Sequence, residues 1–217
     1  MFLGHFAVGL AFKRVAPESN LGWLIAAPLF LDLIWPIFVL AGLERVEIDP
    51  GNTIVTPLNF IYYPISHSLM MALVWSLVVG VLYYAISRYG KGAVAVCAGV
   101  FSHWLLDVVV HRADLPLYPG SNTVVGLGLW NSFAGTLVAE IVLFVAGAVL
   151  YLTFTRAVDK VGRYAMWAFL IFVALVYAAN VLGPPPPNST AVAVTVLLMW
   201  LFPIWAGWAD HHRVTEP

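Results

Sequence analysis

The chain has 217 residues, of which 62% are hydrophobic and only 10% are charged, and its mean hydropathy is +0.91. This balance excludes an ordinary water-soluble domain, because a fold of this size could not bury so much apolar surface. Ten Lys and Arg against eleven Asp and Glu exclude a basic nucleic-acid-binding surface, and a single cysteine, Cys97, excludes a cysteine-based metal site. We therefore predict a membrane protein in which any metal is held by His and carboxylate side chains.

The first predicted element is a short apolar segment from Phe2 to Phe12. It is too short to cross about 30 Å of hydrocarbon, and its basic pair Lys13 and Arg14 follows it, unlike the basic leader of a secretory signal. We expect a retained helix that lies at the interface or is half-inserted.

Six longer apolar stretches follow, each near the length of about 20 residues that crosses a bilayer as a helix. They are Leu21–Leu43, Ile65–Ser87, Ala93–Val110, Ser132–Phe154, Tyr164–Leu182 and Ala191–Trp208. The sequence thus predicts an all-α, polytopic membrane protein with six transmembrane helices. Residues 1–217 form a single integral membrane domain, in which residues 1–145 carry the candidate site and residues 164–208 form two plain hydrophobic spans.

The basic residues predict the orientation, because Lys and Arg in short loops stay on the cytoplasmic side. Most of them fall on one side if both termini are cytoplasmic: Lys13, Arg14, Arg88, Lys91, Arg156, Lys160, Arg163 and Arg213. The long loops Glu44–Pro64 and His111–Asn131 are then external. Asp210 and the histidines after it are expected in a solvated tail.

Polar residues within the apolar stretches are few and chemically similar, and each such group needs a partner or a function. They are His5, Asp32, His67, His103, Asp107 and Glu140. His103 and Asp107 are four residues apart, so both side chains lie on one helix face and can bind one metal ion. His5, Asp32 and His67 complete the predicted ligand set, whose nitrogen and oxygen donors suit zinc, manganese or iron.

The rise per helical residue, counted from the basic loops, estimates how deep each group lies in the membrane, and groups at similar depth can meet. His5, Asp32 and His103 lie roughly 12 to 18 Å deep, whereas Asp107 and Glu140 lie at roughly 24 Å. His67 lies at roughly 31 Å and fits only if its helix is tilted or starts deeper.

Simpler interpretations exist for each residue taken alone. A single intramembrane histidine commonly bonds a neighbouring carbonyl group, and Ser66 beside His67 can be the N-cap of the second span. Glu140 can be a ligand, a general base or a partner that orients an imidazole. The shared site is favoured because acids and imidazoles concentrate in the first four helical segments.

The order and setting of these residues resemble a bacterial family of inner-membrane-bound, metal-dependent hydrolases whose founding member is LexA-regulated. The resemblance covers residues 1–145 and is carried by His5, Leu31-Asp32-Leu33-Ile34-Trp35-Pro36, Ser66-His67-Ser68, Ser102-His103-x-x-Leu106-Asp107 and Leu115-Pro116-Leu117-Tyr118-Pro119. Asp32 stands alone where the family often has Asp-x-Asp. Tyr63-Pro64-Ile65-Ser66 replaces the family's Arg-Gly-x-Thr.

The ligand order is also distantly similar to that of the zinc-dependent phospholipases C. That similarity implies one metal held by Asp32, His67, His103 and Asp107, and a second metal touched by His5 and a bridging Asp107. Thr136 replaces the histidine that would pair with Glu140, so a complete three-metal site is not expected.

Our leading hypothesis is a metal-dependent hydrolase of the bacterial inner membrane that acts on an ester or phosphodiester of a lipid or lipid-linked substrate. Its site faces the outer half of the bilayer, beneath loops that carry Arg45, Arg112, Tyr62 and Tyr63. Arg112 would pair with a phosphate, and Asp32, Asp107 or Glu140 would accept a proton. The alternatives are a proton- or divalent-cation-coupled transporter and a scaffold with a structural metal or none.

Overall fold

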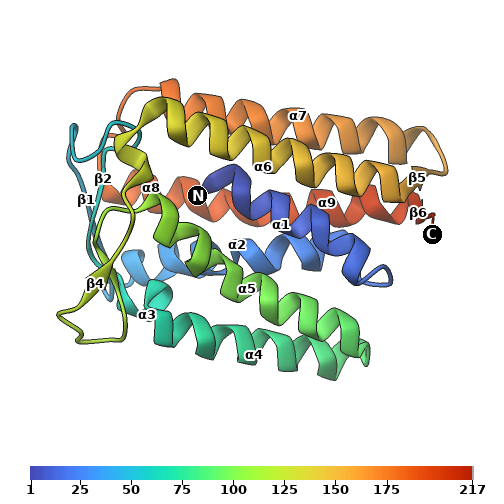
Figure 1. The fold of residues 1–217 in the computed structure, drawn as a ribbon, viewed down its shortest axis with the longest axis horizontal. Coiled ribbons are helices and arrows are strands. Elements are labelled where there is room, and N and C mark those ends of the chain that lie inside the picture. Colours follow the sequence, from blue (N-terminus) through green and yellow to red (C-terminus); the bar gives the residue numbers. More distant parts are fainter. Residues whose placement is uncertain (217) are drawn as a thin grey trace.

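The computed structural model describes residues 1–216 and is a bundle of long helices (Figure 1). Within these residues, six helical segments are long and apolar enough to cross a membrane. They are α2 (Leu21–Leu40), α4 (Leu69–Ser87), α5 (Gly90–Val110), α6 (Phe133–Phe154), α7 (Lys160–Leu182) and the continuous segment Ser189–His211, which comprises α8 (Ser189–Leu197), the 3-10 turn η2 (Leu198–Trp200) and α9 (Leu201–His211). The predicted all-α polytopic membrane fold is confirmed.

Five of the six spans begin at side chains that accept a hydrogen bond from the first helical turn, the usual function of an N-cap. The caps are Asn20 for α2, Ser68 for α4, Ser132 for α6, Asp159 for α7 and Asn188 for α8. The second span therefore begins later than predicted, since Ser68 rather than Ser66 is its cap. Ser68 is extended, with φ −76° and ψ 151°, and it separates α4 from the short helix α3 (Pro64–His67).

The short N-terminal helix α1 (Phe2–Val15) lies inside the bundle, packed against α6, α2 and α5. It is enclosed by these helices and does not lie on the surface of the bundle, because residues such as Phe6 and Leu10 are fully buried. Its 14 residues rise only about 21 Å, less than the hydrocarbon thickness. Its N-terminal end consequently lies part-way along the bundle, whereas the C-terminus lies at one end (Figure 1).

The two ends of the bundle differ in structure. One end carries the long connections, with β1 (Arg45–Ile48) antiparallel to β2 (Leu58–Tyr62), β3 (Leu115–Pro116) antiparallel to β4 (Val124–Val125), and the 3-10 turn η1 (Leu129–Asn131). The other end carries the tight connection between α4 and α5, and β5 (Thr155–Ala157) paired with β6 (Arg213–Thr215) (Figure 1). We call these the loop end and the basic end, because most of the basic residues lie in or beside the connections at the second.

Asp210 is buried, which corrects the prediction of a solvated tail. The last helix continues to His211, so Asp210 faces the bundle, where Lys13 Nζ lies 2.6 Å from its Oδ2. Tyr151 donates its hydroxyl hydrogen to Asp210 Oδ1 at 2.7 Å. The buried ion pair and the Tyr151 hydrogen bond together join α1, α6 and α9 near the basic end.

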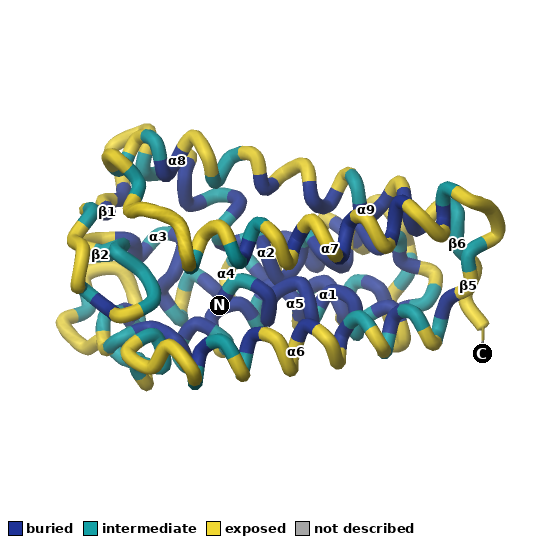
Figure 2. Tube along the Cα trace, turned by 90° about the horizontal axis from the view of Figure 1, so that it is seen from above, coloured by how far each residue is buried: buried dark blue, intermediate teal, exposed yellow. Residues whose placement is uncertain are grey.

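Burial follows the arrangement expected of a membrane bundle. Buried residues concentrate in α1, α2 and α5 at the centre, while α6 and α7 present exposed residues outward (Figure 2). The outward side chains are largely apolar, among them Val142, Val149, Ile171 and Leu175. Four of the polar candidates, His5, Asp32, His103 and Asp107, lie on these central helices, while the buried His67 and Glu140 come from α3 and α6.

Candidate metal centre

Four separate elements bring the predicted ligands together. His103 comes from α5, His67 from α3 and Asp32 from α2. The Nε2 atoms of His103 and His67 lie 3.2 Å apart, and Asp32 Oδ1 lies 3.5 Å from His67 Nε2 and 3.9 Å from His103 Nε2. These three side chains form one group whose ligand atoms could hold a metal ion.

Asp107 joins this group to a second one. It follows His103 by one helical turn of α5, and its Oδ2 lies 3.0 Å from His103 Nε2. Its other oxygen, Oδ1, lies 3.2 Å from His5 Nε2 and 2.5 Å from the amino group of Met1. The two carboxylate oxygens thus face in different directions, and His5, His103 and Asp107 form a second group that could hold a metal ion.

The imidazole of His103 presents a lone pair to the centre. Its Nδ1 lies 2.7 Å from the carbonyl oxygen of Pro28, which can only accept a hydrogen bond. Nδ1 therefore carries the hydrogen, and Nε2 of the neutral ring has none. His67 is held in a similar way, because Ser66 Oγ lies 2.6 Å from its Nδ1 and its Nε2 faces His103.

This arrangement fits a bound cation. The Nε2 atoms of His67 and His103 converge with one oxygen each of Asp32 and Asp107, and the neutral His103 ring has no hydrogen on Nε2. His5 strengthens the case, since its ring stacks on that of His103 at 3.9 Å, its Nε2 faces Asp107 Oδ1, and its buried Nδ1 has no hydrogen-bond partner. Buried polar atoms are normally satisfied, and a metal ion held between these donors would satisfy them.

The centre is closed on most sides. His5, His67, His103 and Asp107 are buried, whereas the Asp32 side chain is 30% exposed. Access to the centre is therefore from the side of Asp32. His103 lies seven residues before the end of α5, about 10 Å below the loop end.

Glu140, a residue of α6, contacts the start of α1. Its Oε1 accepts the backbone N–H of Phe2 at 2.9 Å, and its Oε2 accepts that of Gly4 at 3.0 Å. The first N–H groups of a helix have no partner within it, so a carboxylate is favoured there. Glu140 thus anchors the helix that carries His5, a role that was not among those predicted for it; its roles as a ligand, a general base or a partner of an imidazole stay predictions.

A polar network covers the centre at the loop end. His111 Nε2 lies 3.7 Å from Asp107 Oδ2, and His111 Nδ1 lies 2.9 Å from Asp114 Oδ1. Tyr63 also donates to Asp114 Oδ1, at 2.8 Å. Burial, together with the neighbouring Asp114 carboxylate, raises the pKa of Tyr63 well above its ordinary value, so the phenol keeps its hydrogen. The network therefore holds His111 over the metal centre.

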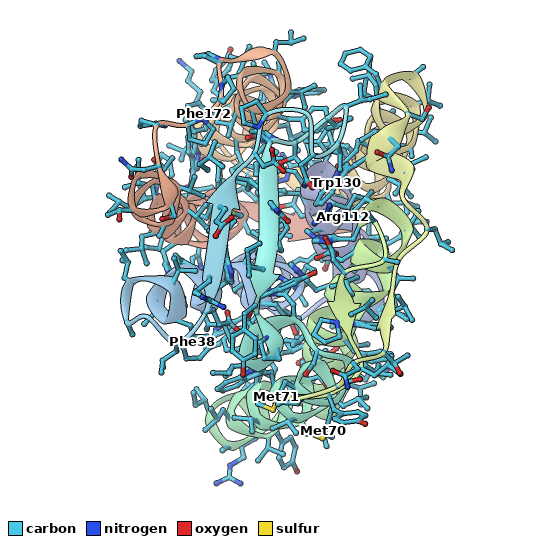
Figure 3. The ribbon with its side chains drawn as sticks, turned by 90° about the vertical axis from the view of Figure 1, so that its left-hand side faces the viewer. Phe38, Met70, Met71, Arg112, Trp130 and Phe172 are labelled. Carbon is cyan, nitrogen blue, oxygen red and sulfur yellow. The ribbon has the colours of Figure 1, made fainter. Side chains whose placement is uncertain are left out.

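Arg112 belongs to the same cover. Its guanidinium group contacts Asn59 Oδ1 at 2.5 Å and Asp114 Oδ2 at 3.3 Å, and the side chain is 41% exposed. Figure 3 looks onto the loop end and shows Arg112 close to Trp130 near the middle of this face. Arg112 lies over the centre without reaching its ligand atoms, so pairing with a substrate phosphate stays a prediction.

The depth estimate was wrong for His67, and the reason is the break at Ser68. His67 belongs to α3, which is not a continuation of α4, so the rise of α4 does not give its depth. Asp107 and Glu140 were placed deeper than His5, yet both contact the first turns of α1. Depths calculated from the rise of separate, differently inclined helices are not accurate to one helical turn.

Several residues around the centre were not predicted as part of it: Glu44, Pro28 and Asp114, and Ser66 in its contact with His67. Asp114 carried a signal, because it follows His111 by three residues. Glu44 and Pro28 carried none that we can identify. Their partners lie 21 and 75 residues away, and only the fold brings them together.

No protein-family model matches this chain, and neither a curated protein nor a solved structure does. The function is therefore argued from the site and its setting.

Proposed function

We propose that this protein is a membrane-embedded, metal-dependent hydrolase, as its resemblance to the LexA-regulated inner-membrane family implies. The observation that carries the proposal is the convergence of the Nε2 atoms of His67 and His103, 3.2 Å apart, with Asp32 and Asp107 inside an apolar bundle. A buried group of imidazoles and carboxylates that opens on one side is typical of catalytic metal sites.

Asp32, His67, His103 and Oδ2 of Asp107 would hold one divalent metal ion, and His5 with Oδ1 of Asp107 would contact a second. Zinc is the first choice for such donors, and manganese is the second. When bound, the metal supplies Lewis acidity and lowers the pKa of water toward neutrality. Among the protein groups, Asp32 is the best placed to accept a proton, because its carboxylate lies at the open side.

The proposed substrate is an ester or phosphodiester of a lipid or lipid-linked molecule. The site opens about 10 Å below the loop end, at a depth that an amphiphile reaches from within the bilayer. Because Lys and Arg concentrate at the basic end, we infer that this end faces the cytoplasm and that the site faces the outer half of the inner membrane. Arg112, partly exposed above the centre, would bind a phosphate group.

Elemental analysis of detergent-purified protein tests the proposal. We expect stoichiometric zinc or manganese in the wild type and its loss in His103→Ala and Asp107→Ala. His211→Ala is the matched control, because His211 is an exposed histidine at the basic end. Thermal unfolding of the same samples separates loss of metal from loss of fold.

The metal-loaded protein is then assayed for hydrolysis of ester- and phosphodiester-containing lipids in detergent micelles. Turnover that disappears with the metal supports the proposal. Absence of metal from the wild type, even after zinc and manganese are added back, would overturn it and favour the transporter alternative.

A further inference from the structure

Glu44 is a buried acid outside both groups of candidate ligands. It lies in the turn between α2 and β1. Its Oε1 accepts the backbone N–H groups of Ile65 and Ser66, both at 2.8 Å, and its Oε2 lies 2.7 Å from Ser66 Oγ. All three donors belong to α3, the four-residue helix that ends at His67. Glu44 is therefore connected to the metal centre through a single hydroxyl group.

The direction of the hydrogen bonds along this connection follows from the groups involved. Ser66 has one hydroxyl hydrogen, and an ionised carboxylate can only accept, so the hydrogen points to Glu44 Oε2. The Ser66 oxygen then presents a lone pair to His67 Nδ1 at 2.6 Å, and Nδ1 must carry the ring hydrogen. Nε2 of His67 consequently has no hydrogen and presents its lone pair to the centre.

We propose that Glu44 is a positioning residue for the metal: acting through Ser66, it fixes the tautomer in which His67 Nε2 is free to bind a cation. This inference rests on the proposed metal-dependent function and deepens it, because it assigns part of the metal affinity to a residue that does not touch the metal. Outer partners that orient metal-binding histidines commonly affect affinity by about 10- to 100-fold.

Glu44→Gln reverses the direction of the hydrogen bonds through Ser66 without changing the size of the side chain at position 44. The amide oxygen still accepts the N–H groups of Ile65 and Ser66, but the amide nitrogen now donates to Ser66 Oγ. The Ser66 hydroxyl hydrogen then points to His67 Nδ1 at 2.6 Å, in preference to the Tyr63 carbonyl oxygen at 3.4 Å, and the ring hydrogen moves to Nε2, against the metal. We expect the zinc affinity, measured by competition with a chromophoric chelator, to fall by about 10- to 100-fold.

Two further variants separate this effect from a general loss of charge or fold. Glu47→Gln neutralises an exposed acid on the neighbouring strand β1 and should leave the zinc affinity unchanged. Ser66→Ala removes the connection without imposing the wrong tautomer, so its loss of affinity should be smaller than that of Glu44→Gln. The visible absorption spectrum of the cobalt-substituted protein should change in Glu44→Gln and not in Glu47→Gln.

The tautomer itself is measured in metal-free protein by ring ¹⁵N NMR, with His67→Gln used to assign the signals. We expect a hydrogen on Nδ1 of His67 in the wild type and on Nε2 in Glu44→Gln. Wild-type zinc affinity together with an Nδ1 hydrogen in Glu44→Gln would overturn the role of Glu44 and leave the metal site intact. Failure of the wild type to bind zinc or manganese would instead overturn the proposed function.

Discussion

At the scale of single residues, Glu140 illustrates how one buried carboxylate supports the site without entering it. Each of its oxygens accepts a backbone N–H from the first turns of α1, so the anion compensates donors that the helix itself cannot satisfy. The same contacts fix the position of α1 along the bundle. His5, one turn further along, is thereby held against His103.

Glu140→Ala should therefore destabilise the protein. It leaves two buried N–H groups without an acceptor, and each unsatisfied group costs about 1 to 3 kcal/mol. We expect a lower unfolding temperature in detergent, and a loss of whatever metal His5 helps to hold. Glu47→Ala, at an exposed position on β1, is the control. Wild-type stability with abolished turnover would show instead that Glu140 acts directly in the reaction.

At the scale of helices, small residues let α1 lie close to its neighbours. A Cβ added at Gly147 of α6 would lie 2.6 Å from Ala7 Cα of α1, and one added at Gly9 of α1 would lie 2.6 Å from the Leu24 carbonyl oxygen of α2. Close approach at small residues is a common way to pack helices in membranes, where the hydrophobic effect between helices is weak. The position of α1, and hence of His5, depends on these contacts.

Gly147→Leu should move α1 away from α6. Overpacking of this kind costs about 1 to 3 kcal/mol, and the clash is with backbone atoms that cannot rotate away. We expect a lower unfolding temperature and a reduced metal content, measured on the same samples. Gly90→Ala is the control, because a Cβ there meets nothing within 4 Å. An unchanged metal content in Gly147→Leu would mean that the placement of His5 does not depend on this contact.

At the scale of helices, some parts of the fold were predictable from the sequence and others were not. Hydropathy located all six spans, because crossing hydrocarbon demands a long apolar run whatever the tertiary structure. The His103–Asp107 pair was predictable because four-residue spacing is a local property of a helix. The break at Ser68 and the contact between Glu44 and α3 were not, since they depend on side-chain partners distant in sequence.

At the scale of the whole molecule, the two ends differ in charge and in architecture. The basic end has short connections, and most of the Lys and Arg lie in or beside them, whereas the loop end has long connections with two small antiparallel sheets above the candidate metal centre. Positive residues in short loops remain cytoplasmic. We therefore expect the same charge distribution to set the orientation of the protein and the leaflet from which the proposed substrate would reach Asp32.

Cysteine labelling tests this orientation directly, because replacing Cys97 by Ser gives a background without cysteine. Tyr118→Cys introduces an exposed thiol at the loop end, and Val158→Cys introduces one at the basic end. In intact spheroplasts, we expect a membrane-impermeant maleimide to label Tyr118→Cys at once and Val158→Cys only after permeabilisation. The reverse pattern would place the loop end in the cytoplasm and move the proposed substrate to the inner leaflet. Labelling of both without permeabilisation would contradict the odd number of spans between these two positions, because α6 is the only candidate span separating them in residues 1–216.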